Sequence, residues 1–352
     1  MAAERIPPRS LSDSWKLGPL EVPNRVLLAP LAGIGNWFVR LQAKRYGAGM
    51  AVSEMVSTHA VHYRNRKTCE ELLRIDLRER AGGPVAIQLF GEDPAIMRSA
   101  AAEVARRGAD AIDLNMGCPV PKVARTGAGA ALIAEPHLAV ALARAATAGA
   151  AEGAPHRAVP VTVKVRSGLH PGDTRGYDLA HRLVDSAGVA AIGFHPRSAA
   201  VHHKGTPDYE LVRRLVDSLP APVILSGGLS DAASIRHAFE LTGATAVMLA
   251  RGTLGNPWLF REVLDGEPVE PTPDQVLAEL TWTMDRAAEH LGEDRASRYL
   301  RKFYPWYVPR LALPAVPSRE LQDALMCAPS LASARALLAR CREPLEGALD
   351  PA

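Results

Sequence analysis

A regular alternation of short apolar runs with longer stretches that favour helices is the feature that most restricts the fold of this chain. Eight such runs occur in about 255 residues, a spacing typical of a (β/α)8 barrel. Several runs are apolar throughout, as expected for parallel strands that are covered on both faces. The fold class is therefore predicted to be α/β, with a TIM barrel favoured and a doubly wound sheet as the alternative. We expect strands at residues 25–29, 50–54, 85–90, 111–115, 160–165, 190–195, 222–226 and 246–250.

The pattern changes after Phe260. Pro268, Pro271 and Pro273 mark a linker, and the sequence beyond it predicts helices interrupted by further prolines. We therefore predict two domains, a catalytic barrel at residues 1–262 and a smaller all-helical domain at residues 272–352. Four aromatic residues of the second domain, spaced three and four apart, fit a helical core at least as well as a base-stacking surface, and we expect them in the core: Tyr299, Phe303, Trp306 and Tyr307.

Composition excludes several classes of protein. A chain of 352 residues with 47% hydrophobic and 22% charged residues is neither disordered nor collagen-like. The four cysteines lack CxxC or histidine-rich spacing, so neither a disulfide framework nor a metal site is predicted. No apolar run is long enough to span a membrane and the N-terminus has no signal-peptide pattern, so we expect a cytoplasmic protein. A net charge of +3 does not by itself indicate a polyanionic partner.

Polar residues follow most of the predicted strands, at the ends that a barrel brings to one mouth. Gln88, Asn115 and Lys164 would present amide and ammonium groups to a flat heterocycle with ring nitrogens and carbonyls. A lysine inside an apolar strand is costly unless it is paired, so Lys164 is seldom only structural. Its other functional interpretation is a nucleophile that forms a Schiff base.

The last two strands end in residues that suit a phosphate group. Gly227 and Gly228 allow backbone N–H groups to approach an anion, and Arg251 supplies positive charge at the neighbouring strand end. Barrels commonly bind phosphate at the loops after strands seven and eight. The sequence therefore predicts a cofactor that carries phosphate, with tight turns as the purely structural interpretation.

Cys118 follows the fourth predicted strand in a Gly-Cys-Pro turn. A thiol with an ordinary pKa near 8.5 is mostly protonated at neutral pH, so it can act as a general acid. An arbitrary cysteine is more often a small buried apolar residue. The position of Cys118 close to Asn115 favours the catalytic interpretation.

Together these motifs resemble those of the tRNA-dihydrouridine synthases, flavoproteins that reduce selected uridines in tRNA. The most specific element is Asn115-Met-Gly-Cys-Pro119. The resemblance runs in order from about Leu17 to Phe260 and is weaker beyond, where Arg301 and Lys302 look like part of the family's helical RNA-binding domain. Matching segments are residues 29–34, 52–55, 85–91, 112–119, 161–168, 194–197, 222–224, 242–244 and 256–260.

The resemblance implies an FMN site at the barrel mouth. Asn115 and His195 would line this site, together with the residues that hold the cofactor. Those residues would be Pro30, Leu31, Ala32, Gln88, Lys164, Ser226, Gly227, Gly228, Ala250 and Arg251.

The resemblance also implies the reaction. NADPH or NADH reduces the FMN, the flavin N5 delivers hydride to C6 of the uracil, and Cys118 donates a proton to C5. Hydride addition produces an enolate-like anion, so the reaction needs donors to the uracil carbonyls, such as Asn115 and Arg166. Arg197 lines the same mouth and is expected to contact the substrate.

The implied partner is tRNA, whose target base must leave its stack to reach a cofactor inside a barrel. Phosphate contacts are expected from the segment 63–67 and from cations between Arg295 and Arg310, with Arg301 and Lys302 named as substrate contacts. The tail beyond residue 261 is net acidic, which weighs against a purely electrostatic role for it. No membrane or metal partner is expected, and the sequence is compatible with a monomer without fixing the oligomeric state.

Three departures from the family pattern bear on FMN affinity: Gly35-Asn36 replaces Thr-Asp, Gly228 replaces an acid, and Ala250 replaces a glycine. Other functions therefore stay open. An FMN-dependent reductase of a free pyrimidine or other small enone would use the same barrel without a helical tail. A flavin-free aldolase would use Lys164 as its Schiff base, and a non-catalytic RNA chaperone would need neither.

Overall fold

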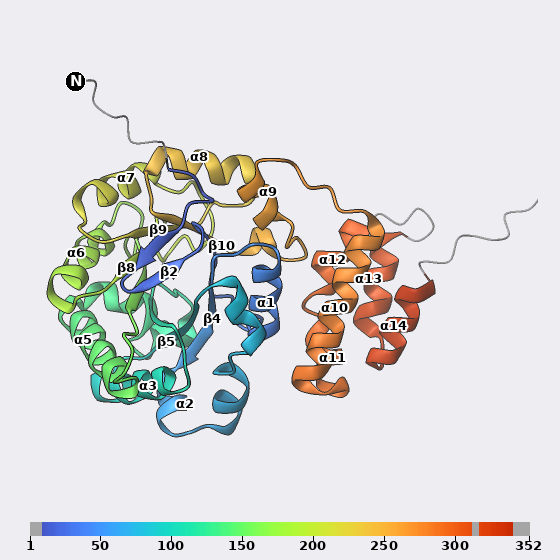
Figure 1. Cartoon of the computed structure of the whole chain (residues 1–352), viewed down its shortest axis with the longest axis horizontal. Coiled ribbons are helices and arrows are strands. Elements are labelled where there is room, and N and C mark those ends of the chain that lie inside the picture. Colours follow the sequence, from blue (N-terminus) through green and yellow to red (C-terminus); the bar gives the residue numbers. More distant parts are fainter. Residues whose placement is uncertain (1–8, 312–316, 341–352) are drawn as a thin grey trace, which may run out of the picture. The chain divides into compact units, whose positions relative to one another are not determined.

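Eight parallel strands form a closed barrel in the computed structural model, which describes residues 9–311 and 317–340 (Figure 1). β10 (Ala246–Leu249) pairs with β9 (Val223–Ser226) on one side and with β3 (Val26–Leu28) on the other. This pairing closes the sheet, so the TIM-barrel prediction is confirmed and the doubly wound alternative is wrong. The remaining strands are β4 (Met50–Ser57), β5 (Val85–Phe90), β6 (Ala111–Met116), β7 (Val161–Arg166) and β8 (Ala191–His195).

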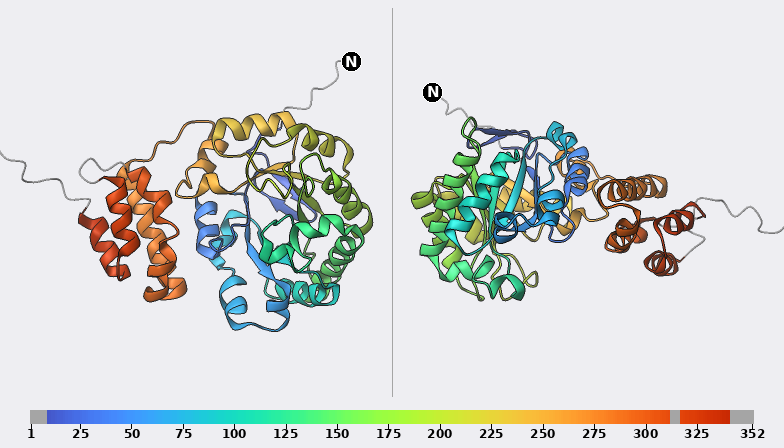
Figure 2. Two further views of the ribbon diagram at one scale, coloured as in Figure 1. Left: turned by 180° about the vertical axis from the view of Figure 1, so that it is seen from behind. Right: turned by 90° about the horizontal axis from the view of Figure 1, so that it is seen from below.

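Helices lie around the outside of the strands, as the views in Figures 1 and 2 show. Asp93 is the N-cap of α3, where its side chain accepts hydrogen bonds from the backbone N–H groups of Ala95 and Ile96. At a helix C-terminus, Gly243 ends α8 (Ala232–Thr242) in the left-handed conformation, with a φ of 64°. The helices of the barrel are α1 (Trp37–Arg45), α2 (Thr58–His62), α3 (Pro94–Arg106), α4 (Pro121–Ala124), α5 (Pro136–Gly153), α6 (Arg175–Ala187), α7 (Tyr209–Ser218), α8 (Ala232–Thr242) and α9 (Leu259–Asp265). Four short irregular helices complete it: η1 (Thr68–Leu72), η2 (Leu77–Gly82), η3 (Gly129–Ala134) and η4 (Arg251–Thr253).

An antiparallel hairpin, β1 (Trp15–Leu17) and β2 (Leu20–Val22), precedes the barrel and was not predicted. Its side chains Trp15, Leu17 and Val22 join the core cluster formed by residues near the amino ends of the barrel strands. Four of those barrel residues, on β5, β6, β8 and β10, are alanines that leave room for larger side chains. The hairpin therefore covers the barrel end opposite to the predicted site.

The barrel interior consists of an apolar layer and a polar layer. Side chains two residues apart on a strand share a face, so one strand can contribute to both layers. On β5 the apolar Ala86 is followed by Gln88, and on β9 Ile224 is followed by Ser226. The polar layer lies at the carboxyl ends of the strands, where the predicted cofactor residues are.

Contacts divide the chain into a barrel unit (Met1–Gly252 and Leu259–Glu267) and a helical unit (Thr253–Trp258 and Pro268–Ala352). The helical unit holds α10 (Pro273–Leu291), α11 (Glu293–Leu300), α12 (Tyr304–Leu311), α13 (Ser318–Cys327) and α14 (Leu331–Arg340). Within it Phe303 and Tyr307 are buried, as expected, whereas Tyr299 and Trp306 are half-buried. Residues 1–8 of the predicted barrel domain and residues 312–316 and 341–352 of the predicted helical domain lie outside the described residues. No described helix is both long and apolar enough to cross a membrane.

A buried ion pair between Arg40 on α1 and Glu79 on η2 fixes the turn that follows β3. The Arg40 Nε to Glu79 Oε2 distance is 2.7 Å, and both side chains are fully buried. Arg40 also donates to the carbonyl oxygens of Gly35 and Arg74. Because Gly35 belongs to the turn after β3, this ion pair links the outer shell of the barrel to its mouth.

Removing one member of this pair should destabilise the protein strongly. Glu79→Ala leaves the Arg40 guanidinium buried without its counterion, which is expected to lower the free energy of unfolding by about 3–5 kcal/mol. Glu210→Ala is a matched control because it removes the exposed Arg213–Glu210 pair, which should contribute no more than about 1 kcal/mol. Urea unfolding of the three proteins measures both values, and equal losses in the two variants would contradict the structural role of Arg40 and Glu79.

Candidate active site

The predicted site residues of the barrel unit come from seven of the eight strand ends. Neighbouring strands bring several of them opposite one another, since Asn115 on β6 is in register with Lys164 on β7. Arg166 at the end of β7 is likewise in register with His195 on β8. Arg301 and Lys302 belong to the helical unit and are described with it below.

The turn after β3, which contains Pro30, Leu31 and Ala32, is fixed to β4 by hydrogen bonds. Leu31 is buried, and its carbonyl oxygen accepts from the N–H groups of Ile34 and Gly35, the latter at 2.7 Å. The N–H of Gly33 donates to Glu54 Oε2 on β4 at 2.8 Å. Ala32 is exposed, so the turn presents its backbone at the barrel mouth in a defined conformation.

A chain of hydrogen bonds, the Asp113 chain, runs from β7 through the barrel interior to the Cys118 turn. Thr162 Oγ1 donates to Asp113 Oδ1 at 2.5 Å, and Gln88 Nε2 donates to Asp113 Oδ2 at 2.6 Å. Gln88 Oε1 then accepts from Asn115 Nδ2 at 2.9 Å. Because Gln88 uses its amide nitrogen toward Asp113 and its oxygen toward Asn115, the orientation of its side chain is defined.

Asp113 was not assigned a role from the sequence. Its position two residues before Asn115 on β6 gives both side chains the same face of the strand, which is the signal that could have revealed it. Burial raises the pKa of Asp113 to about 6, although its hydrogen bonds from Thr162 and Gln88 and the charge of Lys164 act in the opposite direction. The barrel interior thus holds a carboxyl group that changes charge near neutral pH.

Cys118 lies on a turn that Asn115 holds in place. Asn115 Oδ1 accepts hydrogen bonds from the N–H groups of Gly117 at 3.2 Å and Cys118 at 2.9 Å. The carbonyl oxygen of Cys118 accepts from Ala130 N–H, and a side chain at Gly129 would collide with this oxygen. The thiol is free of disulfide bonds and half-exposed, so it is available for proton transfer.

Lys164 lies in the polar layer with its ammonium group on Ser226. The Nζ atom donates to Ser226 Oγ at 2.8 Å. Gly193 on β8 lies beside the stem of the lysine, since a Cβ there would be in van der Waals contact with Lys164 Cγ at 3.4 Å. Burial, followed by the positive charge of Arg166, lowers the pKa of Lys164 to about 8.

Arg166 fixes the loops that surround the mouth. Its guanidinium donates to the carbonyl oxygens of Gly117 at 2.9 Å, Ser198 at 3.2 Å and His202 at 2.7 Å. Burial lowers its pKa to about 10, with the charge of Arg197 acting in the same direction. Nη2 has no acceptor among the described residues, so one edge of the group is free to meet a ligand. The predicted substrate contact of Arg166 therefore stays a prediction, and its contacts in the structure are to the loops.

His195 is held neutral. Burial, followed by the charges of Lys164, Arg166 and Arg197, lowers its pKa far below the usual range. Arg197 lies beside it, with Nη1 3.4 Å from His195 Nε2 and Nε donating to the carbonyl oxygen of Gly205 at 2.9 Å. A neutral imidazole can donate or accept a hydrogen bond, which suits a polar ligand next to three cations.

The turn after β9 requires glycine at two positions. Gly227 and Gly228 have φ angles of 98° and 81°. A Cβ at Gly227 would lie 2.4 Å from His195 Nε2, and a Cβ at Gly228 would lie 2.6 Å from Tyr209 Oη. Within the described part of the chain neither backbone N–H finds an acceptor. Unpaired, half-buried N–H groups of this kind commonly bind an anion.

The loops after β9 and β10 lie side by side. A Cβ at Gly252 would lie 2.9 Å from the carbonyl oxygen of Ser230 and 3.2 Å from that of Leu229. The exposed Arg251 precedes Gly252 and follows Ala250. The positive charge of Arg251 and the free N–H groups of the β9 turn therefore belong to one region of the mouth.

Positive charge dominates this mouth. Three of its cations, Lys164, Arg166 and Arg197, make hydrogen bonds to hydroxyl, carbonyl and imidazole groups, and among the described residues none of the four cations forms an ion pair with a carboxylate. These cations are Lys164, Arg166, Arg197 and Arg251. No group of three His, Cys, Asp or Glu side chains in the described chain could hold a metal ion. An organic ligand with a phosphate and a polar ring fits these donors better than a cation does.

The structure accounts for two of the three sequence departures. A Cβ at Gly35 would lie 3.0 Å from both Glu54 N and Leu31 O, and Asn36 is the N-cap of α1. At Gly228 the space for a side chain is occupied by Pro207 and Tyr209. The loss of an acid at residue 228 therefore coincides with neighbours that leave it no room. Nothing in the structure explains Ala250.

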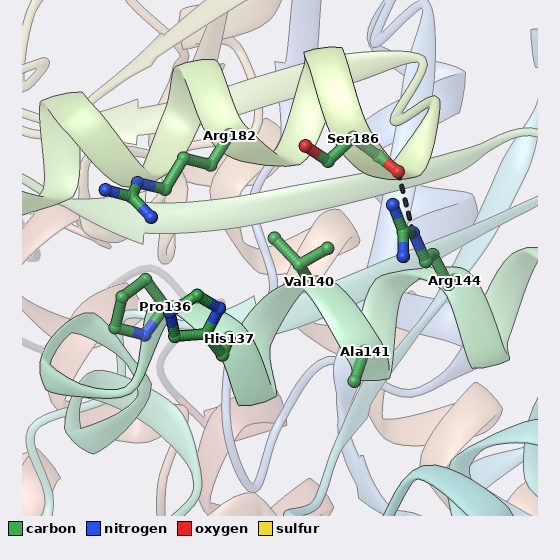
Figure 3. Close-up of a pocket in the computed structure, with 7 residues that line it drawn as sticks. All are labelled: Pro136, His137, Val140, Ala141, Arg144, Arg182 and Ser186. Carbon is green, nitrogen blue, oxygen red and sulfur yellow. Dashed lines mark hydrogen bonds between the residues drawn. The ribbon is translucent and has the colours of Figure 1, made fainter.

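A separate cavity of about 270 Å³ lies on the outside of the barrel between α5 and α6 (Figure 3). Arg144 spans it and donates to the carbonyl oxygen of Ser186 at 2.7 Å (Figure 3). The cavity contains none of the predicted site residues. Its lining residues are Pro136, His137, Val140, Ala141, Arg144, Arg182 and Ser186.

This chain is similar in sequence to proteins of one known family. The model of the dihydrouridine synthase family matches residues 27–337. The chain is 33% identical over 310 residues to tRNA-dihydrouridine synthase B of Pseudomonas aeruginosa, which covers 84% of this chain and 87% of that protein. It is 36% identical over 313 residues to a probable tRNA-dihydrouridine synthase of Mycobacterium tuberculosis, covering 84% and 78% of the two chains.

Solved structures show the same fold at lower sequence identity. Histamine dehydrogenase from Rhizobium sp. 4-9 matches with a TM-score of 0.54 at 12% identity, over 73% of this chain and 48% of that one. A variant of NCR from Zymomonas mobilis matches with a TM-score of 0.51 at 17% identity, over 74% and 92% of the two chains. These similarities concern the fold alone.

The raised pKa of Asp113 predicts how stability depends on pH. The folded protein holds this proton up to about pH 6, whereas the unfolded chain releases it near pH 3.8, so the stabilisation is lost as the pH rises between these values. Relative to Asp113→Asn, the wild-type free energy of unfolding should fall by about 2–3 kcal/mol from pH 4 to pH 7. Urea unfolding at four pH values measures this difference, with Asp185→Asn on the exposed face of α6 as the control. A difference that does not change with pH would contradict the burial of an ionising Asp113.

Proposed function

The chain belongs to the dihydrouridine synthase family, and on this premise we propose that it reduces uridines of tRNA to dihydrouridine. The observation that carries the proposal at the site is a free thiol, Cys118, on a turn that Asn115 holds beside Lys164 and Arg166. This arrangement suits reduction of a carbon–carbon double bond, which needs a proton donor at one carbon and positive charge near the developing anion.

FMN fits the residues of the mouth. The unpaired N–H groups of Gly227 and Gly228, together with Arg251, would hold its phosphate. Lys164, Gln88 and Asn115 would lie along its ring, beside the turn of Pro30, Leu31 and Ala32 and the neutral His195. When bound and reduced by NADPH or NADH, the flavin would supply the hydride that adds to C6 of the uracil.

Cys118 would complete the reduction by protonating C5. The S–H bond of the thiol breaks, a C–H bond forms at C5, and the thiolate that remains takes a proton from solvent. Lys164 and Arg166 both interact electrostatically with Cys118, so they would stabilise the thiolate in the interval. Arg166 Nη2 would donate a hydrogen bond to one uracil carbonyl. Asn115 Nδ2 would donate to the other, in place of its weak 3.6 Å hydrogen bond to Met55 Sδ.

The helical unit would contribute to tRNA binding. Four cations of the segment from Arg295 to Arg310 are exposed, namely Arg295, Arg298, Lys302 and Arg310. Arg301 is half-buried and donates to the carbonyl oxygen of Ala328, whereas Lys302 lies 4.9 Å from the centre of the Tyr299 ring. Lys302 is therefore the better candidate for a phosphate contact of the two residues named from the sequence.

The family match extends to residue 337 and so includes most of the helical unit. A reductase of a free pyrimidine or small enone would have no use for that unit. A Schiff-base aldolase would use Lys164, whose pKa is lowered to about 8, but it would have no use for Cys118. Reduction of tRNA is the proposal that employs the thiol, the cationic mouth and the helical unit together.

Replacement of Cys118 should stop the reaction without releasing the cofactor. Cys118→Ala and Cys118→Ser both lack an acid of suitable pKa, and loss of general acid catalysis should lower dihydrouridine formation by about 10²–10⁴-fold. Mass spectrometry of treated tRNA measures the product, and flavin absorbance of the purified protein measures retained FMN. Cys327→Ala, in the helical unit, is the control. Full activity of Cys118→Ala would disprove the acid role.

Replacement of Lys302 should weaken tRNA binding in a salt-dependent way. Lys302→Ala removes one phosphate contact, so the Michaelis constant for tRNA should rise about 3–10-fold and the slope of log affinity against log salt should fall by about 0.7–0.9. Lys16→Ala, on the hairpin at the opposite end of the barrel, is the matched control for the loss of one exposed lysine. Identical salt slopes for the two variants would mean that Lys302 does not touch phosphate.

A further inference from the structure

The loop that follows β4 and α2 presents an exposed aromatic ring among cations. Residues 62–67, here called the Tyr63 loop, form six consecutive exposed positions, and Tyr63 has 72% of its surface exposed. We propose that Tyr63 stacks on an unpaired base of the substrate RNA while Arg64 and Lys67 contact the adjoining phosphates. This inference rests on the proposed function and adds to it the surface that receives the RNA next to the catalytic thiol.

The Tyr63 ring is supported on one side and open on the other. His62 meets it edge-on, with ring centres 4.8 Å apart at 80°, and His59 lies 6.4 Å away. His62 is itself held by a hydrogen bond between Nδ1 and Ser99 Oγ on α3. An exposed aromatic ring that is already fixed in place loses little conformational freedom when a base stacks on it.

The backbone of the Tyr63 loop has a defined conformation. Arg64 has a φ of 52°, a value that residues other than glycine seldom adopt. Asn65 fixes this turn, because its N–H donates to the carbonyl oxygen of Ala60 and its Oδ1 accepts from both N and Oγ1 of Thr68. The ring and the neighbouring cations are therefore presented as one ordered surface.

The charge of the loop suits a polyanion. No acidic residue occurs from Val56 to Cys69. Arg66 is paired with Glu70 at 3.0 Å, but Arg64 and Lys67 make no ion pair or side-chain hydrogen bond within the described chain. A single aromatic ring between free cations matches the stacking and phosphate contacts of single-stranded RNA. A protein partner would instead call for a wider apolar patch around Tyr63.

The loop leaves the barrel at the same end as Cys118. Near the carboxyl end of β4, Met55 Sδ lies 3.6 Å from Asn115 Nδ2, the residue that holds the Cys118 turn. Next along the chain, Thr58 packs against Gly91 at the end of β5. Figure 1 shows α2 and the segment after it projecting beyond the ring of barrel helices. RNA whose target uridine enters the mouth would therefore pass the Tyr63 loop.

The test compares Tyr63→Ala, Tyr63→Phe and Leu241→Ala in the full-length holoenzyme. Leu241 is an exposed apolar residue on α8 that serves as the matched control. Loss of one stacked base should raise both the Michaelis constant and the dissociation constant for an unmodified tRNA transcript about 5–100-fold in Tyr63→Ala, with the effect on KM rather than kcat. Tyr63→Phe keeps the ring and should recover most of the affinity.

Arg64→Ala with Lys67→Ala should lower the salt slope of tRNA binding by about 1.4–1.8, the value for two lost phosphate contacts. If wild-type protein forms dihydrouridine but Tyr63→Ala binds tRNA as tightly as Leu241→Ala does, the Tyr63 inference is wrong and the proposed function stands. If wild-type protein binds tRNA but forms no dihydrouridine, the proposed function fails. The dissociation constants of the Tyr63 variants then still decide whether the loop binds RNA.

Discussion

Parallel pairing of β10 with β3 is the interaction on which the rest of the molecule depends. An open sheet would spread the strand ends along an edge, whereas closure gathers them into a ring. Closure also divides the interior into two ends with different chemistry. Alanines and the β1–β2 hairpin fill one end, and side chains further along β5, β6, β7 and β9 form the polar layer at the other.

The polar layer concentrates more positive charge than its one buried carboxyl group, Asp113, neutralises. Burial lowers the pKa values of three cations, Lys164, Arg166 and Arg197. Burial also lowers the pKa of His195, which is therefore neutral beside them. Asp113 is the buried carboxyl of the same interior, and its hydrogen bonds go to Thr162 and Gln88. Such a mouth gains from an anionic ligand, because a phosphate and a reduced ring would provide the missing negative charge.

The sequence was sufficient to predict the barrel because short, largely apolar segments recur eight times at regular spacing, and several of them are apolar throughout. It did not reveal the hairpin, whose three-residue strands are too short to show a pattern. The sequence also did not predict the boundary between the two units. Residues 253–258 join the helical unit through the packing of Gly255 against Trp306. The boundary therefore depends on contacts between segments far apart in the chain.

The candidate site was predictable where residue type alone limits the chemistry, as for Lys164, Cys118 and the Gly227-Gly228 turn. Asp113 was missed because its partners Gln88 and Thr162 lie on neighbouring strands, and only the strand register brings them together. Arg166 was expected to meet the substrate, yet three of its hydrogen bonds go to loop carbonyls up to 49 residues away in sequence. A side chain can be assigned to a mouth from its strand, but its partners depend on how the loops fold.

The central claim is that this cationic mouth is built for a flavin anchored by its phosphate. Titration of cofactor-free protein with FMN and with riboflavin, followed by flavin fluorescence, tests it most directly, since the two ligands differ only in the phosphate. The account predicts that one FMN binds per chain, and at least about 100-fold more tightly than riboflavin, because two free N–H groups and Arg251 meet the phosphate. Equal affinities for the two ligands, or no binding of either, would contradict it.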